Sequence, residues 1–162
     1  MINVTKPFLP PLEEILPSLE AIWEGGTLSN GGPFHQELER RLADYLEVPY
    51  VSLFCNATIA LITAQQALGV TGEVITTPYS FVATTHALHW MGNTPVFVDV
   101  EPQSLTIDPS KIDAAITDRT AAIMPLHCYG NTCDASVIDA IARKHRLPVI
   151  YDACHSFGVK DE

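Results

Sequence analysis

Short apolar runs alternate with helix-length amphipathic segments along most of the 162-residue chain. Runs of this length suit strands buried on both faces, and the alternation is typical of right-handed β-α-β units. It predicts an α/β fold with a mostly parallel sheet and helices on both faces. The predicted strands are residues 50–54, 73–76, 95–98, 120–125 and 148–151, and the helices between them are 57–68, 81–91, 111–116 and 135–145.

The first part of the chain departs from this alternation. Prolines predict an extended arm over residues 1–10, and a helix follows at 12–23, ended by two glycines. A small, polar loop at residues 27–32 leads to a helix that starts at Pro33. Residues at three-to-four spacing predict one buried face on that helix; they are Phe34, Leu38, Leu42, Tyr45 and Leu46. We therefore expect an arm, helix and loop in residues 1–32 and an α/β domain in residues 33–162.

Composition narrows the class of protein. Apolar residues make up 47% of the chain, yet the longest apolar runs are too short to span a bilayer, and the start lacks a leader pattern, so we expect a cytoplasmic protein without membrane contact. The four cysteines form no CxxC pair, which favours reduced thiols. A net charge of −10 argues against nucleic-acid binding, and any bound phosphate must be held by local donors.

The stretch YDACHSFG, residues 151–158, follows the last predicted strand. Asp152 would lie at the carboxyl edge of the sheet, where ligands bind in open α/β folds. The alternative is that Asp152 caps a following turn, which Ser156 and Gly158 would close, or a helix that starts near Cys154.

Two further strand-to-helix turns would reach the same edge. Asn56 is a good N-cap, and the backbone N–H groups of Ala57 and Thr58 at a helix start suit a phosphate, although on these residues alone an ordinary cap is the favoured explanation. Phe81 could present a flat ring to a planar ligand, or it could be a core residue. No GxGxxG or Walker sequence is present, so nucleotide-binding motifs of those kinds are not supported.

The turn PLHCYGN, residues 125–131, adds an imidazole and a phenol, from His127 and Tyr129, which are either ligand contacts or ordinary surface residues. A metal site is a weaker alternative, because the spacings fit no structural zinc pattern. Its candidate ligands would be His127, Cys128, Cys133, Cys154 and His155.

Together these turns would place a donor-rich helix start, an aromatic face, an acid and the imidazole of His155 at one edge. Pyridoxal 5′-phosphate is a ligand that fits these four features, because it needs a phosphate cradle, a stacking surface and a carboxylate that keeps its ring nitrogen protonated. The sequence therefore predicts a pyridoxal phosphate site around Asp152.

Ordered motifs along the chain resemble the DegT/DnrJ/StrS family of nucleotide-sugar aminotransferases. They are LSNGGPFHQELE at 28–39, NAT at 56–58, TPYSFVATTHAL at 77–88, PVFVDV at 95–100, PLHCYG at 125–130 and YDACHSFG at 151–158. Within the family, the chain looks most like enzymes of the viosamine-forming type, which aminate the 4-keto group of a dTDP-linked 4-keto-6-deoxyhexose.

The resemblance implies the fold of the aspartate-aminotransferase class, a homodimer with active sites at the subunit interface, and glutamate as amino donor. It implies a phosphate contact at the Ala57-Thr58 turn, ring stacking by Phe81 and a nitrogen contact by Asp152. His155 replaces a glutamine that many members carry near the ring hydroxyl. The implied cofactor-binding residues are Asn56, Ala57, Thr58, Phe81, Asp152 and His155, and the implied substrate-binding residues are Ser29 and Asn30.

One family feature is absent from these 162 residues. The family's Schiff-base lysine lies a few tens of residues beyond the Asp152 motif, and Lys160 is too close to His155 to match it. We expect a longer protein to be the transaminase and this chain alone to be inactive. The alternative is a lysine-free or truncated relative that binds a ligand or partner without turnover. A generic hydrolase or dehydrogenase is disfavoured, because neither GxSxG nor GxGxxG occurs.

Overall fold

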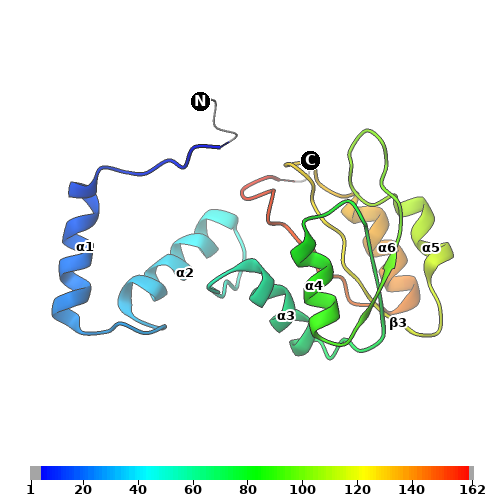
Figure 1. Cartoon of the computed structure of the whole chain (residues 1–162), viewed down its shortest axis with the longest axis horizontal. Coiled ribbons are helices and arrows are strands. Elements are labelled where there is room, and N and C mark those ends of the chain that lie inside the picture. The colour runs from blue at the N-terminus through cyan, green and yellow to red at the C-terminus, as the bar shows by residue number, and fades with distance from the viewer. Residues whose placement is uncertain (1–4, 161–162) are drawn as a thin grey trace. The chain divides into compact units, whose positions relative to one another are not determined.

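The computed structural model describes residues 5–160, and the chain divides into two compact units, Met1–Leu53 and Phe54–Glu162 (Figure 1). The helix that begins at Pro33 thus belongs to the first unit by its contacts, although the sequence grouped it with the α/β part. The expected division by role, residues 1–32 and 33–162, stays a prediction.

The first unit contains two helices, α1 (Leu12–Gly25) and α2 (Pro33–Leu46). Acidic residues occupy the first turn of α1, and Gly26 ends the helix in the left-handed conformation, with φ of 65°. Pro33 begins α2, where its missing N–H costs nothing. The predicted buried face of α2 is wrong within the described structure, because neither helix buries a residue and this unit has no sheet for an apolar stripe to cover.

The second unit is built on a parallel sheet of β1 (Glu73–Thr76), β2 (Thr94–Phe97) and β3 (Thr120–Ile123). Its order is β2-β1-β3, so β1 is central and all four of its residues are buried. Beyond β3, residues 149–152 run parallel to the strands and pair with the sheet through two isolated bridges, Ile123 with Val149 and Leu126 with Asp152. These pairings confirm the predicted parallel α/β sheet.

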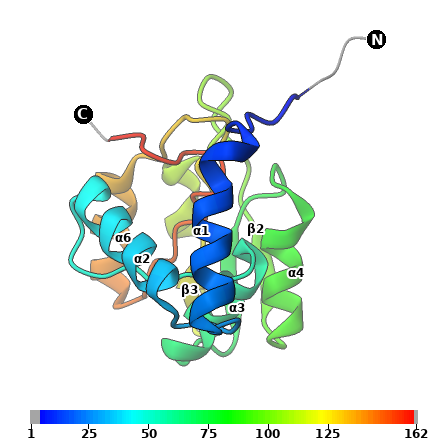
Figure 2. The ribbon, with the colours of Figure 1, turned by 90° about the vertical axis from the view of Figure 1, so that its left-hand side faces the viewer.

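Helices cover both faces of this sheet. Leu61 of α3 (Ala57–Ala67) and Leu88 of α4 (Val82–Trp90) pack in one apolar cluster with Val74 of β1. The neighbouring strand residue, Ile75, points to the other cluster, together with residues of α5 (Ile112–Ala115) and α6 (Ala135–His145). Figure 2 shows α4 and α6 on opposite sides of the strands.

Four sequence expectations about regular structure are corrected. Residues 50–54 form no strand, and Tyr50 is 90% exposed, because no described strand lies beside this segment. Residues 148–151 pair with the sheet only through bridges, and residues 154–159 form turns rather than a helix. The predicted 111–116 helix is a short 3₁₀ turn, Pro109–Lys111, followed by α5.

Buried polar groups close the amino edge of the sheet. Glu73 accepts hydrogen bonds from the Thr117 hydroxyl and from Arg119 Nε, the latter at 2.9 Å. The amide of Asn93 accepts from Gly72 N at 2.9 Å and donates to Gln65 Oε1 at 3.0 Å. The polar groups at this edge therefore find their hydrogen-bond partners within the chain. Within residues 5–160, no helix is both long and apolar enough to cross a membrane.

Candidate functional site

Three loops meet at the carboxyl edge of the sheet, because the parallel strands that precede them end there. They follow β1, β3 and the bridged segment at residues 149–152. A pocket of about 360 Å³ opens between them. Its lining residues are Pro78, Tyr79, Ser80, Phe81, Leu126, Cys128, Tyr129 and His155.

Asp152 lies at this edge and is only 4% exposed. Its carboxylate accepts two hydrogen bonds, from the Thr84 hydroxyl to Oδ2 at 2.6 Å and from Cys154 N to Oδ1 at 3.2 Å. The second bond means that Asp152 does cap the following turn, as the alternative held. The first bond joins residues 68 positions apart and is not explained by turn capping. Among the residues that the structure describes, no cation forms an ion pair with Asp152.

Cys154 adds a third donor beside the Asp152 carboxylate. Burial, reinforced by a hydrogen bond to Asp152, raises the pKa of the Cys154 thiol to about 11, so the thiol is protonated at neutral pH. A protonated thiol is a poor nucleophile, which makes Cys154 a hydrogen-bond donor here rather than a reactive residue. All of these neighbours offer hydrogen atoms to Asp152, whose carboxylate oxygens accept them.

Phe81 is the N-cap residue of α4, and its side chain is 68% exposed. The alternative that Phe81 is a core residue is therefore wrong. Its ring lines the pocket together with Ser80, whose hydroxyl contacts Thr84 Oγ1 at 2.6 Å. Ser80 and Thr84 thus connect the pocket wall to Asp152 through two short hydrogen bonds.

Three more rings form a continuous wall. Tyr129 stacks on His155 with centroids 5.5 Å apart and planes 2° apart, and it meets Tyr79 edge-on at 6.3 Å. A hydrogen bond with Tyr129 is the main reason why the pKa of Tyr79 is raised. Tyr129 has φ of 52° and Gly130 has φ of 88°, in a tight turn closed by hydrogen bonds between Cys128 and Asn131. This turn holds the Tyr129 ring in the pocket wall.

His127 has a structural role, in contrast to Tyr129. Its Nδ1 accepts a hydrogen bond from Cys133 N at 2.9 Å, and its ring stacks on Tyr151 at 5.2 Å. His127 is not among the residues that line the pocket. Of the two rings that the sequence offered in this loop, the structure brings only Tyr129 to the pocket. Across residues 5–160, no three His, Cys, Asp or Glu side chains gather as metal ligands would.

The start of α3 confirms the expected cap. Asn56 Oδ1 accepts a hydrogen bond from Ile59 N at 3.0 Å. The first-turn N–H groups of Ala57 and Thr58 have no carbonyl partner inside α3 and could bind an anion. These residues are not part of the lining of the pocket beside Phe81, so their phosphate role stays a prediction.

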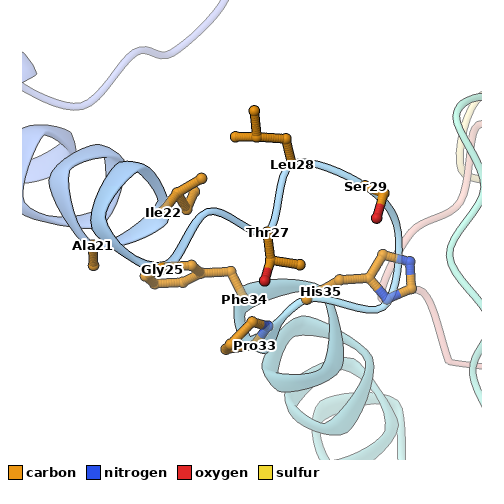
Figure 3. A pocket seen from close by; sticks show the side chains of 10 residues that line it. Ala21, Ile22, Gly25, Thr27, Leu28, Ser29, Pro33, Phe34 and His35 are labelled. Atoms are coloured by element: carbon orange, nitrogen blue, oxygen red, sulfur yellow. The ribbon is translucent and has the colours of Figure 1, made fainter.

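A second pocket, of about 340 Å³, lies within the first unit (Figure 3). Its walls come from the end of α1, the loop at residues 27–32 and the start of α2. Ser29 lines this pocket, and Figure 3 shows it with His35 on the side of the loop away from Ile22. Asn30 is exposed and does not line it. The substrate role of both residues stays a prediction.

The sequence missed Ser80 and Thr84. Both stand inside the motif at residues 77–88, where Ser80 lies just before Phe81, the N-cap residue of α4, and Thr84 lies in the first turn of the helix. Their four-residue spacing could have suggested that the two hydroxyls lie close together. It could not have paired Thr84 with Asp152.

Comparison with protein families gives one matching model. The model described as the DegT/DnrJ/EryC1/StrS aminotransferase family matches residues 12–162. Among curated relatives, the dTDP-4-amino-4,6-dideoxy-D-glucose transaminase of Shigella dysenteriae is 62% identical over 161 residues, covering 99% of this chain and 44% of that protein. The enzyme of the same name from Escherichia coli is 60% identical over 158 residues, covering 98% and 43%.

Solved structures agree with this result. The chain is similar to DesI, solved in the presence of its TDP-sugar product, with a TM-score of 0.91 and 38% identity over 94% of this chain and 39% of that one. It is also similar to NtdA of Bacillus subtilis, solved with bound cofactor PMP, with a TM-score of 0.89 and 36% identity over 99% and 39%. The chain therefore spans less than half the length of these relatives.

Proposed function

The chain belongs to the DegT/DnrJ/EryC1/StrS aminotransferase family, and on this premise we propose that the complete gene product is a pyridoxal-phosphate-dependent aminotransferase. It would transfer an amino group from glutamate to the keto group of a nucleotide-linked 4-keto-6-deoxy sugar. The single observation that carries this proposal is the buried Asp152 carboxylate, held by hydrogen-bond donors and no cation among the described residues, at the edge where Phe81 exposes its ring.

The residues present fit this cofactor. When bound, pyridoxal phosphate supplies an electron sink, which depends on a protonated ring nitrogen. The Asp152 carboxylate accepts two hydrogen bonds and has capacity for another. It can therefore accept a charge-assisted hydrogen bond from the protonated ring nitrogen. Phe81 offers an exposed flat ring on which the cofactor can stack. His155 lines the same pocket, and its imidazole nitrogen can form a hydrogen bond with the hydroxyl group of the cofactor ring. We assign the phosphate to the N–H groups of Ala57 and Thr58, next to the cap residue Asn56.

The amine-transfer step also needs a lysine, as nucleophile and proton carrier. No lysine lines the pocket beside Phe81. Lys111 pairs with Asp108 and Lys144 pairs with Asp113, both on the surface of the second unit. We therefore propose that these 162 residues bind and orient the cofactor, and that they do not catalyse amino transfer by themselves.

The sugar assignment rests on the names of relatives. Two proteins at about 60% identity are dTDP-4-amino-4,6-dideoxy-D-glucose transaminases, and DesI was solved with a TDP-sugar product. We propose a dTDP-linked 4-keto-6-deoxyhexose as substrate, contacts from Ser29 and Asn30, and a homodimer as the working form. The predicted cytoplasmic location belongs to this proposal too.

A turnover assay tests the proposal. The complete gene product is incubated with pyridoxal phosphate, glutamate and dTDP-4-keto-6-deoxyglucose, and the amino sugar is detected by mass spectrometry. We expect amino sugar only when glutamate is present, and none from the 162-residue chain alone. A complete gene product that binds the cofactor without turnover would support the non-catalytic alternative, whereas a protein that binds no cofactor would contradict the proposal.

A further inference from the structure

Ser80, Thr84 and Asp152 form a chain of side-chain hydrogen bonds, here called the hydroxyl chain, which runs from the half-buried Ser80 to two buried residues. Ser80 Oγ and Thr84 Oγ1 are 2.6 Å apart, and Thr84 Oγ1 is 2.6 Å from Asp152 Oδ2. Thr84 is 1% exposed, so water does not compete for its hydroxyl. Both contacts lie at the short end of the range for hydroxyl donors, and a carboxylate acceptor accounts for the one between Thr84 and Asp152.

The direction of the protons follows from their number. An ionised carboxylate only accepts, so the single proton of Thr84 must point at Asp152. The contact between Ser80 and Thr84 then needs the proton of Ser80. Ser80 has a second acceptor, Phe81 O at 3.0 Å, but turning to it would leave the Thr84 oxygen without a donor. The hydrogen bonds therefore run from Ser80 through Thr84 to Asp152, and each bond polarises the next.

The chain also fixes how the carboxylate is oriented. Thr84 holds Oδ2, and Cys154 N holds Oδ1 through one of its lone pairs. A carboxylate has about four acceptor positions, so capacity remains for one more donor. Lys, Arg or His would be the usual donor to a buried carboxylate, and none pairs with Asp152 among residues 5–160.

We propose that Ser80 and Thr84 are positioning residues that hold the Asp152 carboxylate and aim its free acceptor position at the ring nitrogen of a pyridine cofactor. This inference rests on the proposed function. An acceptor position held in line with the ring N–H strengthens that hydrogen bond, and a stronger bond to the carboxylate favours the protonated ring nitrogen. Neither hydroxyl needs to contact the reacting atoms, so their effect passes through Asp152.

The test uses the complete gene product and pyridoxamine 5′-phosphate labelled with ¹⁵N in its ring. The ring ¹⁵N resonance reports whether the nitrogen carries a proton, which a purely structural role would not change. We expect Thr84→Val, which removes the hydroxyl and keeps the shape, to move this resonance toward that of the unprotonated ring. We also expect it to weaken binding by about tenfold, the effect of losing one hydrogen bond to a charged group.

Three further variants complete the comparison. Thr84→Ser should restore the wild-type resonance, because it keeps the hydroxyl. Ser80→Ala should shift the resonance in the same direction as Thr84→Val but by less, since it removes only the outer bond. Thr85→Val is the matched control: it deletes the neighbouring hydroxyl on the same helix, and no described hydrogen bond from that hydroxyl reaches Asp152.

The outcomes separate this inference from the proposed function. If wild-type protein binds no pyridoxamine phosphate, the proposed function itself fails. If wild type binds and Asp152→Asn changes the ring resonance while Thr84→Val does not, only the role of the hydroxyl chain is overturned. An equal change in Thr85→Val, or no rescue by Thr84→Ser, would overturn it as well.

Discussion

The two edges of the parallel sheet treat their buried polar groups differently. At the amino edge, Glu73 and Asn93 find all their main partners within the chain, from Thr117, Arg119 and Gly72. At the carboxyl edge, Asp152 is equally buried and has donors but no cation among the described residues.

Other groups at the carboxyl edge are also left available. Phe81 is largely exposed, and the hydroxyl of Thr76, at the end of β1, is buried without a hydrogen-bond partner. At the amino edge the polar groups hold the fold together, whereas at the carboxyl edge Asp152 and Thr76 keep unused hydrogen-bonding capacity. Substitutions at the two edges should therefore have separable effects, on stability at one and on binding and activity at the other.

Asp152→Asn should produce the largest effect. It keeps the shape of the side chain but removes the negative charge that would hold a proton on the cofactor ring. In the complete protein we expect transamination to fall by about 100- to 1,000-fold, the usual effect of removing one preorganised electrostatic partner. The absorbance of the bound cofactor should be largely preserved. Steady-state kinetics with glutamate and the keto sugar measure the transamination rate of the variant. Near-normal turnover would contradict the role of Asp152 as the partner of the ring nitrogen.

Asn93→Ala tests the amino edge. It removes the acceptor of Gly72 N and the donor to Gln65 Oε1, while Gln65 Nε2 keeps its hydrogen bond to Leu61 O. The expected cost is about 2–4 kcal/mol of unfolding free energy. Urea unfolding followed by circular dichroism measures the change. Cofactor affinity under folding conditions should stay within about twofold of wild type, well inside the range of one weak contact. A stable variant with impaired binding would break the division between the two edges.

Phe81→Ala should weaken cofactor binding moderately. Losing one stacked ring costs roughly 0.5–1.5 kcal/mol, or about two- to tenfold in affinity. Phe97→Ala is a suitable control, since Phe97 is also half-exposed, at the end of β2, and does not line the pocket. Fluorescence titration with pyridoxamine phosphate compares the two variants. Unchanged affinity in Phe81→Ala, or equal loss in both, would reject the stacking role.

The smallest expected effect is a change in acid stability from Glu73. The hydrogen bond from Thr117, and next those from Arg119, lower the pKa of Glu73 below its ordinary value of 4.5. A carboxyl whose pKa is lowered by folding stabilises the protein above its unfolded pKa, and this contribution is lost as pH falls through the folded pKa. The stability difference between wild type and Glu73→Gln should therefore be full at pH 7 and shrink below about pH 4.5. Urea midpoints across this range measure it, and a difference independent of pH would contradict the ion pair's role.

Local signals predicted most of the helices. Side-chain caps at Asn56 and Asp134 mark the starts of α3 and α6, and both helices begin where the sequence placed them. Strand 50–54 was predicted wrongly, because an apolar run forms a strand only when another strand lies beside it. The buried face predicted for α2 failed for the same reason, since periodicity says which side is apolar but not what covers it.

The site was predicted in part. The positions of Asp152, Phe81 and His155 at one edge follow from parallel topology, and the structure brings all three there. The roles of these residues toward a cofactor, and those of Asn56, Ala57, Thr58, Ser29 and Asn30, stay predictions. His127 and Tyr129 stand two positions apart in one loop, and nothing local indicated that only Tyr129 would line the pocket.

By itself, the sequence predicted the parallel sheet, most of its helices and the residue types that follow its strands, because apolar runs, capping residues and turn residues are local signals. Only the tertiary structure decided that Thr84 bonds to Asp152, that Tyr129 stacks on His155 and that the amino edge is closed by Glu73. Each of these contacts joins segments far apart in the chain. Their distances and angles depend on how helices pack against the sheet, which no local pattern encodes.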